Sequence, residues 1–346
     1  SYFSDHFTRQ LMAGVMVHDY LEWKEEVRLE AWDSKPLMKQ LHPVEWRFVN
    51  TWKGNEFLAL ASDTNFDYPV GGFYTGYYAM MVVRHMHEFG TTVEQLAKVS
   101  IKNHGNAIYN PYSQSPSKLT VEEVRSSPMV AYPLTMLDIC TMSDGAAVSI
   151  LASEEKAFEF CDKPIKITGV GTGTDTMRLS DRPRGKVILL PWEREEDYEG
   201  LEYPGVHSCR AGRIAAKMAY EQAGIINKKD IDFVELYDSY TSSEIQAYED
   251  LGLCKYGEGG LFIEKGYSEL DGKIPVNPSG GLLACGHPIG ATGLMQAVFA
   301  FWQLQGTIEK HLGNNTLQIK NARRGIVHSH AGTGTYVTVN VMERGF

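Results

Sequence analysis

The sequence predicts an α/β fold. Stretches typical of strands alternate with stretches typical of helices along the chain, which is the pattern of sheets covered by helices. A glycine-rich segment, Asn277–Gly293, precedes Leu294–Leu304, an apolar run long enough to form a buried helix. Apolar residues make up 43% of the 346 residues and charged residues 22%, as in a soluble globular protein with a large core.

The charge and the cysteines exclude several classes of protein. A net charge of −10 without a basic cluster argues against a nucleic-acid surface. The sequence contains no run of about 18 apolar residues, so no membrane span is predicted, and the first residues lack the pattern of a signal peptide. Five cysteines are scattered with no Cys-x-x-Cys pair, so we expect a cytoplasmic protein with reduced thiols, no metal and no zinc ribbon on this chain.

The first part of the chain is predicted to be helical after an irregular start. Residues 1–60 hold four of the six tryptophans, Trp23, Trp32, Trp46 and Trp52, and we expect irregular structure or short helices that wrap a partner. The expected helices are Tyr77–Phe89, ended by Gly90; a segment that starts with a capping-box-like pattern at Thr91–Glu94 and runs to about Asn103; and Thr120–Arg125.

Strands enter the pattern from residue 137 onward. We expect a strand, a turn and a second strand in Leu137–Leu151, strands at Ile165–Gly169 and Ile231–Asp238, two strands within Arg324–Val341, and helices at Ala152–Phe160, Ser208–Gly224 and Thr241–Leu251. Residues 180–207 are predicted to form a charged surface loop. Gly169–Gly173 is no dinucleotide fingerprint, because the third glycine and the following helix are missing. We place a domain boundary near Lys163, giving domains 1–163 and 164–346.

Three segments at predicted strand ends or helix starts are candidates for chemistry. They are Tyr237–Tyr240, Gly286–Pro288 and His328–Gly334. A glycine-rich turn with a histidine that leads into a helix can hold developing negative charge. Each segment also has an ordinary explanation, since such polar side chains often bond only to backbone. His328 and His330 alternate on one strand, and we expect at most one of them to face a given pocket.

The glycine-rich segment carries a family resemblance. Asn-x-Ser-Gly-Gly-Leu-Leu-x-x-Gly-His-Pro-Ile-Gly-Ala-Thr-Gly, at residues 277–293, resembles the signature of the thiolase superfamily, specifically the sterol-carrier-protein type and its archaeal relatives. The resemblance implies a layered α-β-α-β-α fold, with an incomplete N-terminal half and a complete C-terminal half on this chain. It also implies an enzyme that joins or splits carbon–carbon bonds between acyl-CoA thioesters, with coenzyme A as part of the substrate and no covalently bound cofactor.

The resemblance also assigns residues. His287 matches the histidine that activates the nucleophilic cysteine and contributes to an oxyanion site. His328 matches the residue that moves the α-proton, where a pKa near working pH would suit the task. Tyr237-Asp238-Ser239-Tyr240 stands where this branch usually has His-Asp-Cys-Phe, so Tyr237 and Asp238 complete the catalytic set. The residues expected around coenzyme A are Asn277, Gly280, Gly281, Cys285, Gly286, Gly290, His330 and Gly332.

The nucleophilic cysteine of the family has no match here. Cys140 lies in a segment that does not correspond to it, and Cys285 is too close in sequence to His287. One hypothesis is a split thiolase, in which a separate chain carries the cysteine. A second is a cysteine-independent retro-aldolase acting on a β-hydroxyacyl-CoA, and a third is a non-catalytic acyl-CoA-binding subunit. We further expect thiolase-type dimerisation and association with a small zinc-ribbon/OB-fold subunit.

Overall fold

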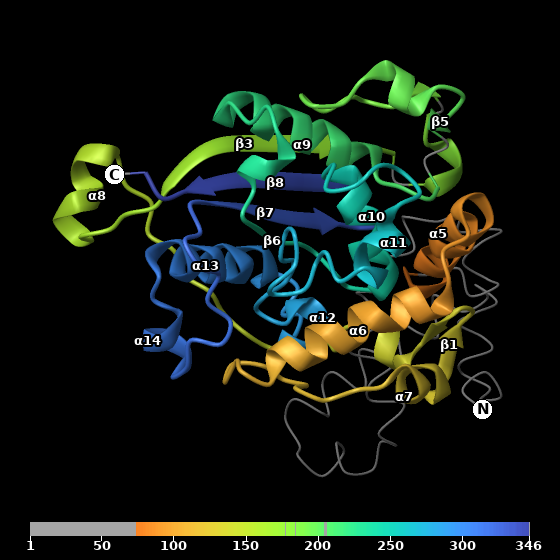
Figure 1. Ribbon diagram of the computed structural model, residues 1–346, viewed down its shortest axis with the longest axis horizontal. Coiled ribbons are helices and arrows are strands. Elements are labelled where there is room, and N and C mark those ends of the chain that lie inside the picture. The colour runs from red at the N-terminus through yellow and green to blue at the C-terminus, as the bar shows by residue number, and fades with distance from the viewer. Residues whose placement is uncertain (1–73, 177, 184, 204–205, 346) are drawn as a thin grey trace, which may run out of the picture. The chain divides into compact units, whose positions relative to one another are not determined.

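The structure, a computed structural model, describes residues 74–176, 178–183, 185–203 and 206–345 (Figure 1). The predicted irregular segment 1–60 and its docking role lie outside these residues. The helices are α5 (Tyr74–Phe89), α6 (Val93–Ala107), α7 (Val121–Ser126), α8 (Glu154–Phe160), α9 (Arg210–Ala223), α10 (Thr241–Asp250), α11 (Gly259–Glu264), α12 (Gly281–Cys285), α13 (Thr292–Gln305) and α14 (Ile308–Leu312). The strands are β1 (Met129–Ala131), β2 (Leu134–Thr135), β3 (Lys166–Thr174), β4 (Gly185–Lys186), β5 (Glu202–Tyr203), β6 (Phe233–Glu235), β7 (Arg324–Ala331) and β8 (Tyr336–Glu343).

A four-stranded sheet organises the second half of the chain. Its strand order is β3-β8-β7-β6. Strand β6 runs parallel to β7, whereas β8 is antiparallel to both of its neighbours. The carboxyl ends of β6 and β7 therefore lie side by side, where the segments around Tyr237 and His330 begin or end. This mixed sheet with its covering helices confirms the predicted α/β class.

Helix α9 lies directly on one face of this sheet, over β3 and β8 (Figure 1). Close contact is possible because β3 presents Gly169, Gly171 and Gly173 to the helix. A Cβ added to any of them would lie 1.8 to 2.1 Å from a carbonyl oxygen of α9. The Gly-x-Gly-x-Gly pattern therefore serves helix–sheet packing, which is a physical reason why it is no nucleotide fingerprint.

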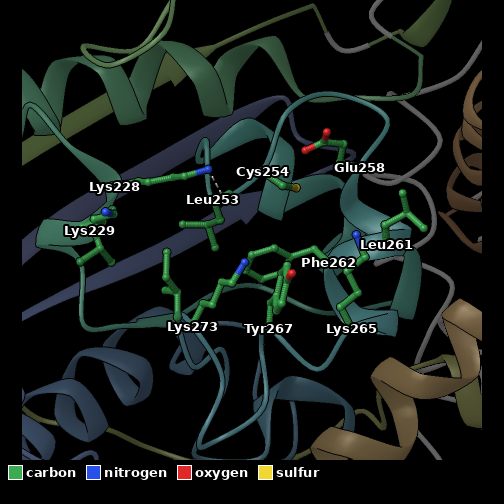
Figure 2. Close-up of a pocket in the computed structure, with 12 residues that line it drawn as sticks. Lys228, Lys229, Leu253, Cys254, Glu258, Leu261, Phe262, Lys265, Tyr267 and Lys273 are labelled. Carbon is green, nitrogen blue, oxygen red and sulfur yellow. Dashed lines mark hydrogen bonds between the residues drawn. The ribbon is translucent and has the colours of Figure 1, made fainter.

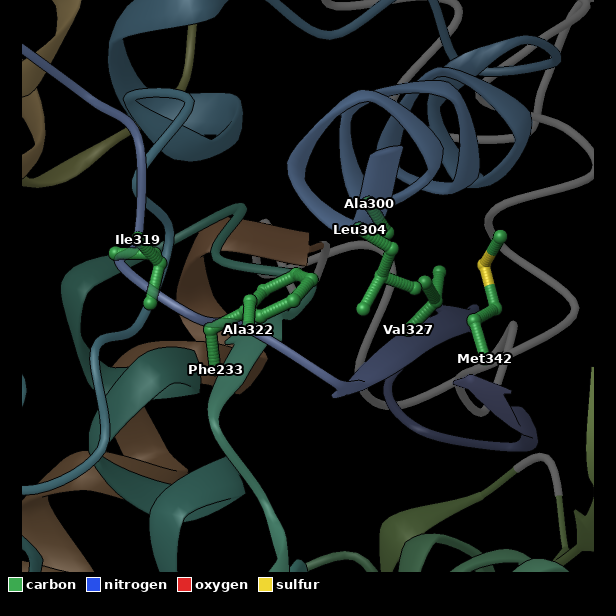
Figure 3. Close-up of a cluster of buried hydrophobic side chains, with 7 residues drawn as sticks. All are labelled: Phe233, Ala300, Leu304, Ile319, Ala322, Val327 and Met342. Carbon is green, nitrogen blue, oxygen red and sulfur yellow. The ribbon is translucent and has the colours of Figure 1, made fainter. Parts of the chain in front are cut away.

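Helix α13 covers the opposite face, over β6 and β7. Ala300 and Leu304 of α13 pack on Phe233 of β6 and Val327 of β7, and Figure 3 shows Leu304 pointing at Val327. All four side chains are less than 3% exposed. Burial of Phe233, Leu304 and Val327 contributes about 1.5 to 3 kcal/mol of hydrophobic stabilisation for each side chain. The predicted buried helix after the glycine-rich segment is thereby confirmed.

The predicted helices of the first part are also confirmed. Gly90 ends α5 with a left-handed φ of +75°. Thr92 then begins α6 with a capping box, in which its hydroxyl accepts from the Gln95 N–H and the Gln95 side chain accepts from the Thr92 N–H. The same motif starts α7, with Thr120 and Glu123. Both caps are local in sequence; the first was predicted one residue early, at Thr91–Glu94, and the second was not predicted.

The strand–turn–strand expected at Leu137–Leu151 is wrong. This stretch forms a short 3₁₀ helix, Met136–Asp138, and isolated bridges at Ile139 and Met142, followed by an extended segment. Val148 and Ile150 are 80% and 82% exposed. Alternating apolar residues form a strand only beside a partner strand, and none lies next to residues 143–151 in the described part of the chain. The domain boundary near Lys163 stays a prediction.

The close approach of α9 to β3 predicts opposite effects of two glycine substitutions. In Gly171→Ala the new Cβ would lie 1.8 Å from the Ala215 carbonyl oxygen, so we expect a loss of about 3 kcal/mol in the free energy of unfolding. Gly105, inside α6, has no atom within 4 Å of the position that a Cβ would take. Gly105→Ala should therefore raise stability by about 0.5–1 kcal/mol, through helix propensity.

Urea unfolding of the two variants beside the unaltered chain measures both effects. Equal stability of Gly171→Ala and the unaltered protein would contradict the packing described for α9 and β3.

Candidate active site

The loop between α12 and α13 presents His287. Gly286 precedes it with φ +120°, and a Cβ there would lie 2.8 Å from the Ser143 hydroxyl, so only glycine fits without strain. The His287 N–H donates to the Thr141 carbonyl at 3.2 Å and to the Ser143 hydroxyl at 3.0 Å. The backbone of His287 is therefore fixed against the segment Thr141–Ser143, which was predicted to lie in a strand.

Hydrogen bonds on both ring nitrogens define the state of His287. The Thr292 hydroxyl donates to the Pro288 carbonyl at 3.0 Å, and it lies 2.7 Å from His287 Nδ1. A hydroxyl has one proton, so Thr292 must accept from Nδ1–H. The opposite nitrogen, Nε2, then carries the lone pair, and it accepts from the Tyr237 hydroxyl at 2.8 Å.

Burial keeps this ring neutral. His287 is 6% exposed, and desolvation lowers its pKa to about 4. At neutral pH the imidazole is therefore an uncharged base whose Nε2 lone pair is held by a phenol hydroxyl. Such a pair can take a proton from a reacting group or return one to it.

Two further histidines lie beside Tyr237. His328 Nδ1 accepts from the Tyr237 N–H at 3.4 Å, and the His330 ring centroid lies 4.1 Å from that of Tyr237. The expectation that at most one of these histidines faces a given pocket is wrong, because residues two apart on a strand share a face. Burial lowers the pKa of His328 to about 4, below the near-neutral value expected for it, and that of His330 well below its ordinary value.

Helix α5 fixes His330 from the other side. The Tyr78 hydroxyl donates to the Gly332 carbonyl at 3.0 Å, so it accepts from His330 Nε2–H at 2.7 Å. The Tyr78 ring also stacks on Tyr240, with centroids 4.2 Å apart. A neutral, singly protonated His330 is thereby held between Tyr78 and Tyr237, which come from two separate parts of the chain.

Asp238 lies beneath the loop that carries His287 rather than beside the Tyr237–His287 pair. It is fully buried and accepts from the N–H of Leu282 at 2.6 Å and of Leu283 at 3.4 Å, at the start of α12. Asn103 of α6 donates to the same carboxylate at 2.7 Å. Burial and the nearby Glu244 carboxylate raise the pKa of Asp238. These contacts place Asp238 where it can hold the helix that leads into Gly286-His287.

A buried charge network continues from Asp238. Glu244 forms a salt bridge with Lys102 at 2.9 Å, and both side chains are fully buried. Asn103 and Asn277 each donate to Glu244 at 2.8 Å. Every charge in this network has a hydrogen-bonded partner, as a buried ion pair requires. The network joins α6, α10 and the start of the glycine-rich segment.

The residues predicted around coenzyme A separate into two groups. Asn277, Gly280, Gly281 and Cys285 lie buried in the interior, and the Asn277 side chain accepts from the Leu236 N–H at 2.8 Å. Gly286 directly precedes His287, Gly290 is exposed on the same loop, and His330 and Gly332 lie in β7 and in the turn that follows it. The structure therefore brings the second group towards the pair, and their part in binding coenzyme A stays a prediction.

An open groove lies next to His287. It has a volume of about 480 Å³ and is lined by residues 143–147 and by the loop from Pro288 to Ala291. Its floor is mostly alanine, glycine and proline, so a chain or an apolar group could lie against it. Gly290 is exposed on its wall.

Sequence reasoning missed Thr292 and Tyr78. Thr292 lies in the recognised motif, five residues after His287, and its place in the first turn of the following helix was the available signal. Tyr78 lies 252 residues from His330, and nothing local in the sequence joins them.

Among the described residues, no cluster of histidine, cysteine and acidic side chains is arranged to hold a metal ion, and none of their helices has the length and apolarity needed to span a bilayer.

Several known proteins are similar to this chain in sequence and in fold. The model of the family "Thiolase C-terminal domain-like" matches residues 202–344. An acetyl-CoA acetyltransferase of Methanothermobacter thermautotrophicus is 42% identical over 287 residues, which are 83% of this chain and 68% of that protein. The benzoylsuccinyl-CoA thiolase subunit BbsB of Thauera aromatica is 36% identical over 68% of this chain and 55% of its own length. The solved Ltp2-ChsH2(DUF35) aldolase superposes on 80% of this chain with a TM-score of 0.64 at 25% identity.

These matches cover most of this chain but only part of each relative. The chain spans about two thirds of the archaeal enzyme and 65% of the aldolase chain. The mixed α/β fold is thiolase-like, and the resemblance inferred from the Gly286-His287-Pro288 motif is confirmed. The chain belongs to the thiolase superfamily, in the type that includes sterol carrier protein 2 and the archaeal acetyl-CoA acetyltransferases.

Proposed function

We propose that this chain provides the acid–base half of an active site that makes or breaks carbon–carbon bonds in acyl-CoA thioesters, and that a separate chain provides the nucleophilic cysteine. The observation that carries the proposal is the neutral Tyr237–His287 pair, which lies beside an open groove and has His328 next to it. The archaeal acetyl-CoA acetyltransferase to which the chain is similar supports the reaction class.

The thiols of this chain do not match the needs of a nucleophile. A reactive cysteine requires a lowered pKa and an accessible sulfur. Burial instead raises the pKa of Cys140, Cys209 and Cys285 to about 12 and that of Cys254 well above its ordinary value. The fifth, Cys161, lies just after α8 and accepts a hydrogen bond from Gln305. The His287 ring nitrogens bond to Thr292 and Tyr237 rather than to a thiol, which supports a nucleophile from elsewhere.

The pair has a defined part in the reaction of a 3-oxoacyl-CoA. His287 Nε2 accepts the proton of the incoming thiol, and the thiolate attacks the 3-oxo carbon. The bond between C2 and C3 then breaks, and its electron pair forms the enolate of the shorter acyl-CoA. The Tyr237 hydroxyl donates a hydrogen bond to developing negative charge, and His328 delivers a proton to C2 of the enolate. Coenzyme A then attacks the acylated cysteine: its thiol proton returns to His328, and the leaving cysteine thiolate regains its proton from His287. Asp238, through α12, positions His287.

The surface next to the groove supports a partner chain. Residues 146–151 belong to no helix or strand and form no backbone hydrogen bonds within the described residues, and Val148, Ile150 and Leu151 are 78 to 82% exposed. Such a segment can bind an added strand. The similar BbsB is named as a thiolase subunit, and the similar aldolase as a complex with ChsH2. A small zinc-ribbon/OB-fold subunit and thiolase-type dimerisation are further parts of this proposal.

A retro-aldol reaction is the second candidate, and the Tyr237–His287 hydrogen bond favours it. The Tyr237 phenol can take the proton of a β-hydroxyl group as it passes its own proton to His287 Nε2. The C2–C3 bond then breaks to a carbonyl product and an enolate, and the enolate takes up the proton held by the pair. This reaction needs no cysteine. The likeness to an aldolase at a TM-score of 0.64 supports it, whereas the 42% identical acetyltransferase supports the thiolase reaction.

Trapping the acyl intermediate distinguishes the candidates. The chain is purified from its native source with its partners, mixed with 3-oxoacyl-CoA or β-hydroxyacyl-CoA, quenched in acid and measured by intact-protein mass spectrometry. An acylated cysteine on a partner chain supports the split thiolase. Turnover without any acylated cysteine, abolished by Tyr237→Phe, supports the aldolase. Coenzyme A binding without turnover of either substrate would contradict both and leave a binding subunit.

Substitutions at the pair should lower the rate without unfolding the protein. We expect His287→Ala to lower kcat/KM of the assembled enzyme by about two orders of magnitude or more, because the base is lost together with the ring that positions the Tyr237 hydroxyl. Tyr112→Phe is the matched control, since the Tyr112 side chain is 61% exposed and its hydroxyl bonds to His311 rather than to the pair. Activity of His287→Ala close to that of the control would rule out this assignment.

The lowered histidine pKa values predict an acid-shifted pH profile. His287 and His328 should stay neutral until the pH approaches about 4, so kcat/KM should hold from neutral pH to about pH 5 and fall below it. Their pKa in the unfolded chain is about 6.5, so the stability that depends on their neutral forms is full above that pH and is lost as pH falls towards 4.

The test is a pH–rate profile, with circular dichroism at each pH to separate unfolding from loss of catalysis. An acid limb centred near an ordinary histidine pKa would show that these rings are solvated rather than buried.

A further inference from the structure

A second cleft lies at the opposite end of β6 from the Tyr237–His287 pair. Ile231, two residues before β6, lines it, whereas Tyr237 follows the end of that strand. The cleft has a volume of about 520 Å³ and lies between the 3₁₀ helix Lys228–Asp230, helix α11 and the segment from Tyr267 to Ile274 (Figure 2). Nothing in the proposed reaction uses it.

Four lysines line this cleft, in a chain whose net charge is −10. They are Lys228, Lys229, Lys265 and Lys273, and Glu258 is the single acidic residue of the lining. Within the described part of the chain, none of these four lysines forms an ion pair. The cleft therefore concentrates uncompensated positive charge, which attracts anions.

Tyr267 lies at the centre of this charge. Lys273 Nζ is 3.4 Å from the centroid of its ring and Lys265 Nζ is 6.0 Å from it. In Figure 2 the lysine and tyrosine side chains project into the same open space. Hydrogen bonding to Lys273 and the charges of both ammonium groups lower the pKa of the Tyr267 phenol, which agrees with a positive potential at this position.

The base of the cleft is apolar. Ile231, Leu253, Phe262 and Ile274 are all 6% exposed or less. A cavity of this volume, with an apolar base and a few charged groups, has the dimensions of a small-molecule site rather than of a surface for a long polyanion. The apolar base suits a ring or a short chain, and the lysines suit phosphate groups.

We propose that this cleft binds a phosphorylated small molecule that also has an aromatic or apolar part, such as a nucleoside diphosphate. Phosphate oxygens would bond to Lys265, Lys273 and Lys229, while the ring lies over Ile231 and Phe262. The site is separate from the Tyr237–His287 pair and does not rest on the proposed reaction.

Titration calorimetry with ADP tests the proposal on the full chain. The expected result is saturable binding that weakens as salt is added, because exposed charges are screened. Inorganic pyrophosphate should bind more weakly than ADP, and adenosine more weakly still, since each retains only one kind of contact. The double substitution Lys265→Gln with Lys273→Gln should lower ADP affinity about tenfold or more.

Lys320→Gln is the matched control, because Lys320 is exposed and does not line the cleft. ADP affinity should be unchanged in this variant, and circular dichroism shows whether both variants are folded. Absence of ADP binding at millimolar concentrations would overturn the proposal. So would equal ADP affinity in the double variant and the control, which would place the nucleotide elsewhere. Neither result would bear on catalysis at His287.

Discussion

The hydrogen bond between the Tyr237 hydroxyl and His287 Nε2, 2.8 Å long, joins the end of β6 to the loop between α12 and α13. Such a bond needs one donor and one acceptor, and the bond from Nδ1–H to Thr292 leaves the lone pair of a neutral ring on Nε2, so the Tyr237 hydroxyl is the donor. Burial keeps the ring uncharged. The other features of the site follow from this pair: His328 and His330 pack on Tyr237, and Ser143 holds the backbone of His287. A prearranged pair of this kind needs little reorganisation when charge develops.

The interior beneath the pair is polar, and this has a structural purpose. Asp238 bonds to the start of α12, and Lys102, Asn103 and Glu244 tie the same region to α6 and α10. Buried ion pairs are a weak source of stability, because desolvation offsets the attraction. Their effect here is on geometry, because the network fixes the orientation of α12 and thereby the position of Gly286 and His287. The loop that carries His287 is thus supported from below by rigid elements.

Local sequence signals predicted much of this fold. The cap near Thr92, predicted one residue early, and the apolar helix after Gly293 involve neighbours in sequence. The segment 143–151 could not be predicted from its alternation, because a strand depends on a partner beside it. Thr292 and Tyr78 illustrate the same limit at the site, where hydrogen bonds link residues that no local pattern connects. Tyr237 and His287 were both predicted, but their direct bond, which sets the protonation of each, required the three-dimensional arrangement.

The protonation of His287 is the central claim, and nitrogen NMR measures it directly. In protein labelled with ¹⁵N-histidine, long-range proton–nitrogen correlations report which ring nitrogen carries a proton, and His287→Gln identifies the signals of this residue. At neutral pH we expect a neutral ring with the proton on Nδ1 and a lone pair on Nε2. A proton on Nε2, or an imidazolium ring, would contradict this protonation state.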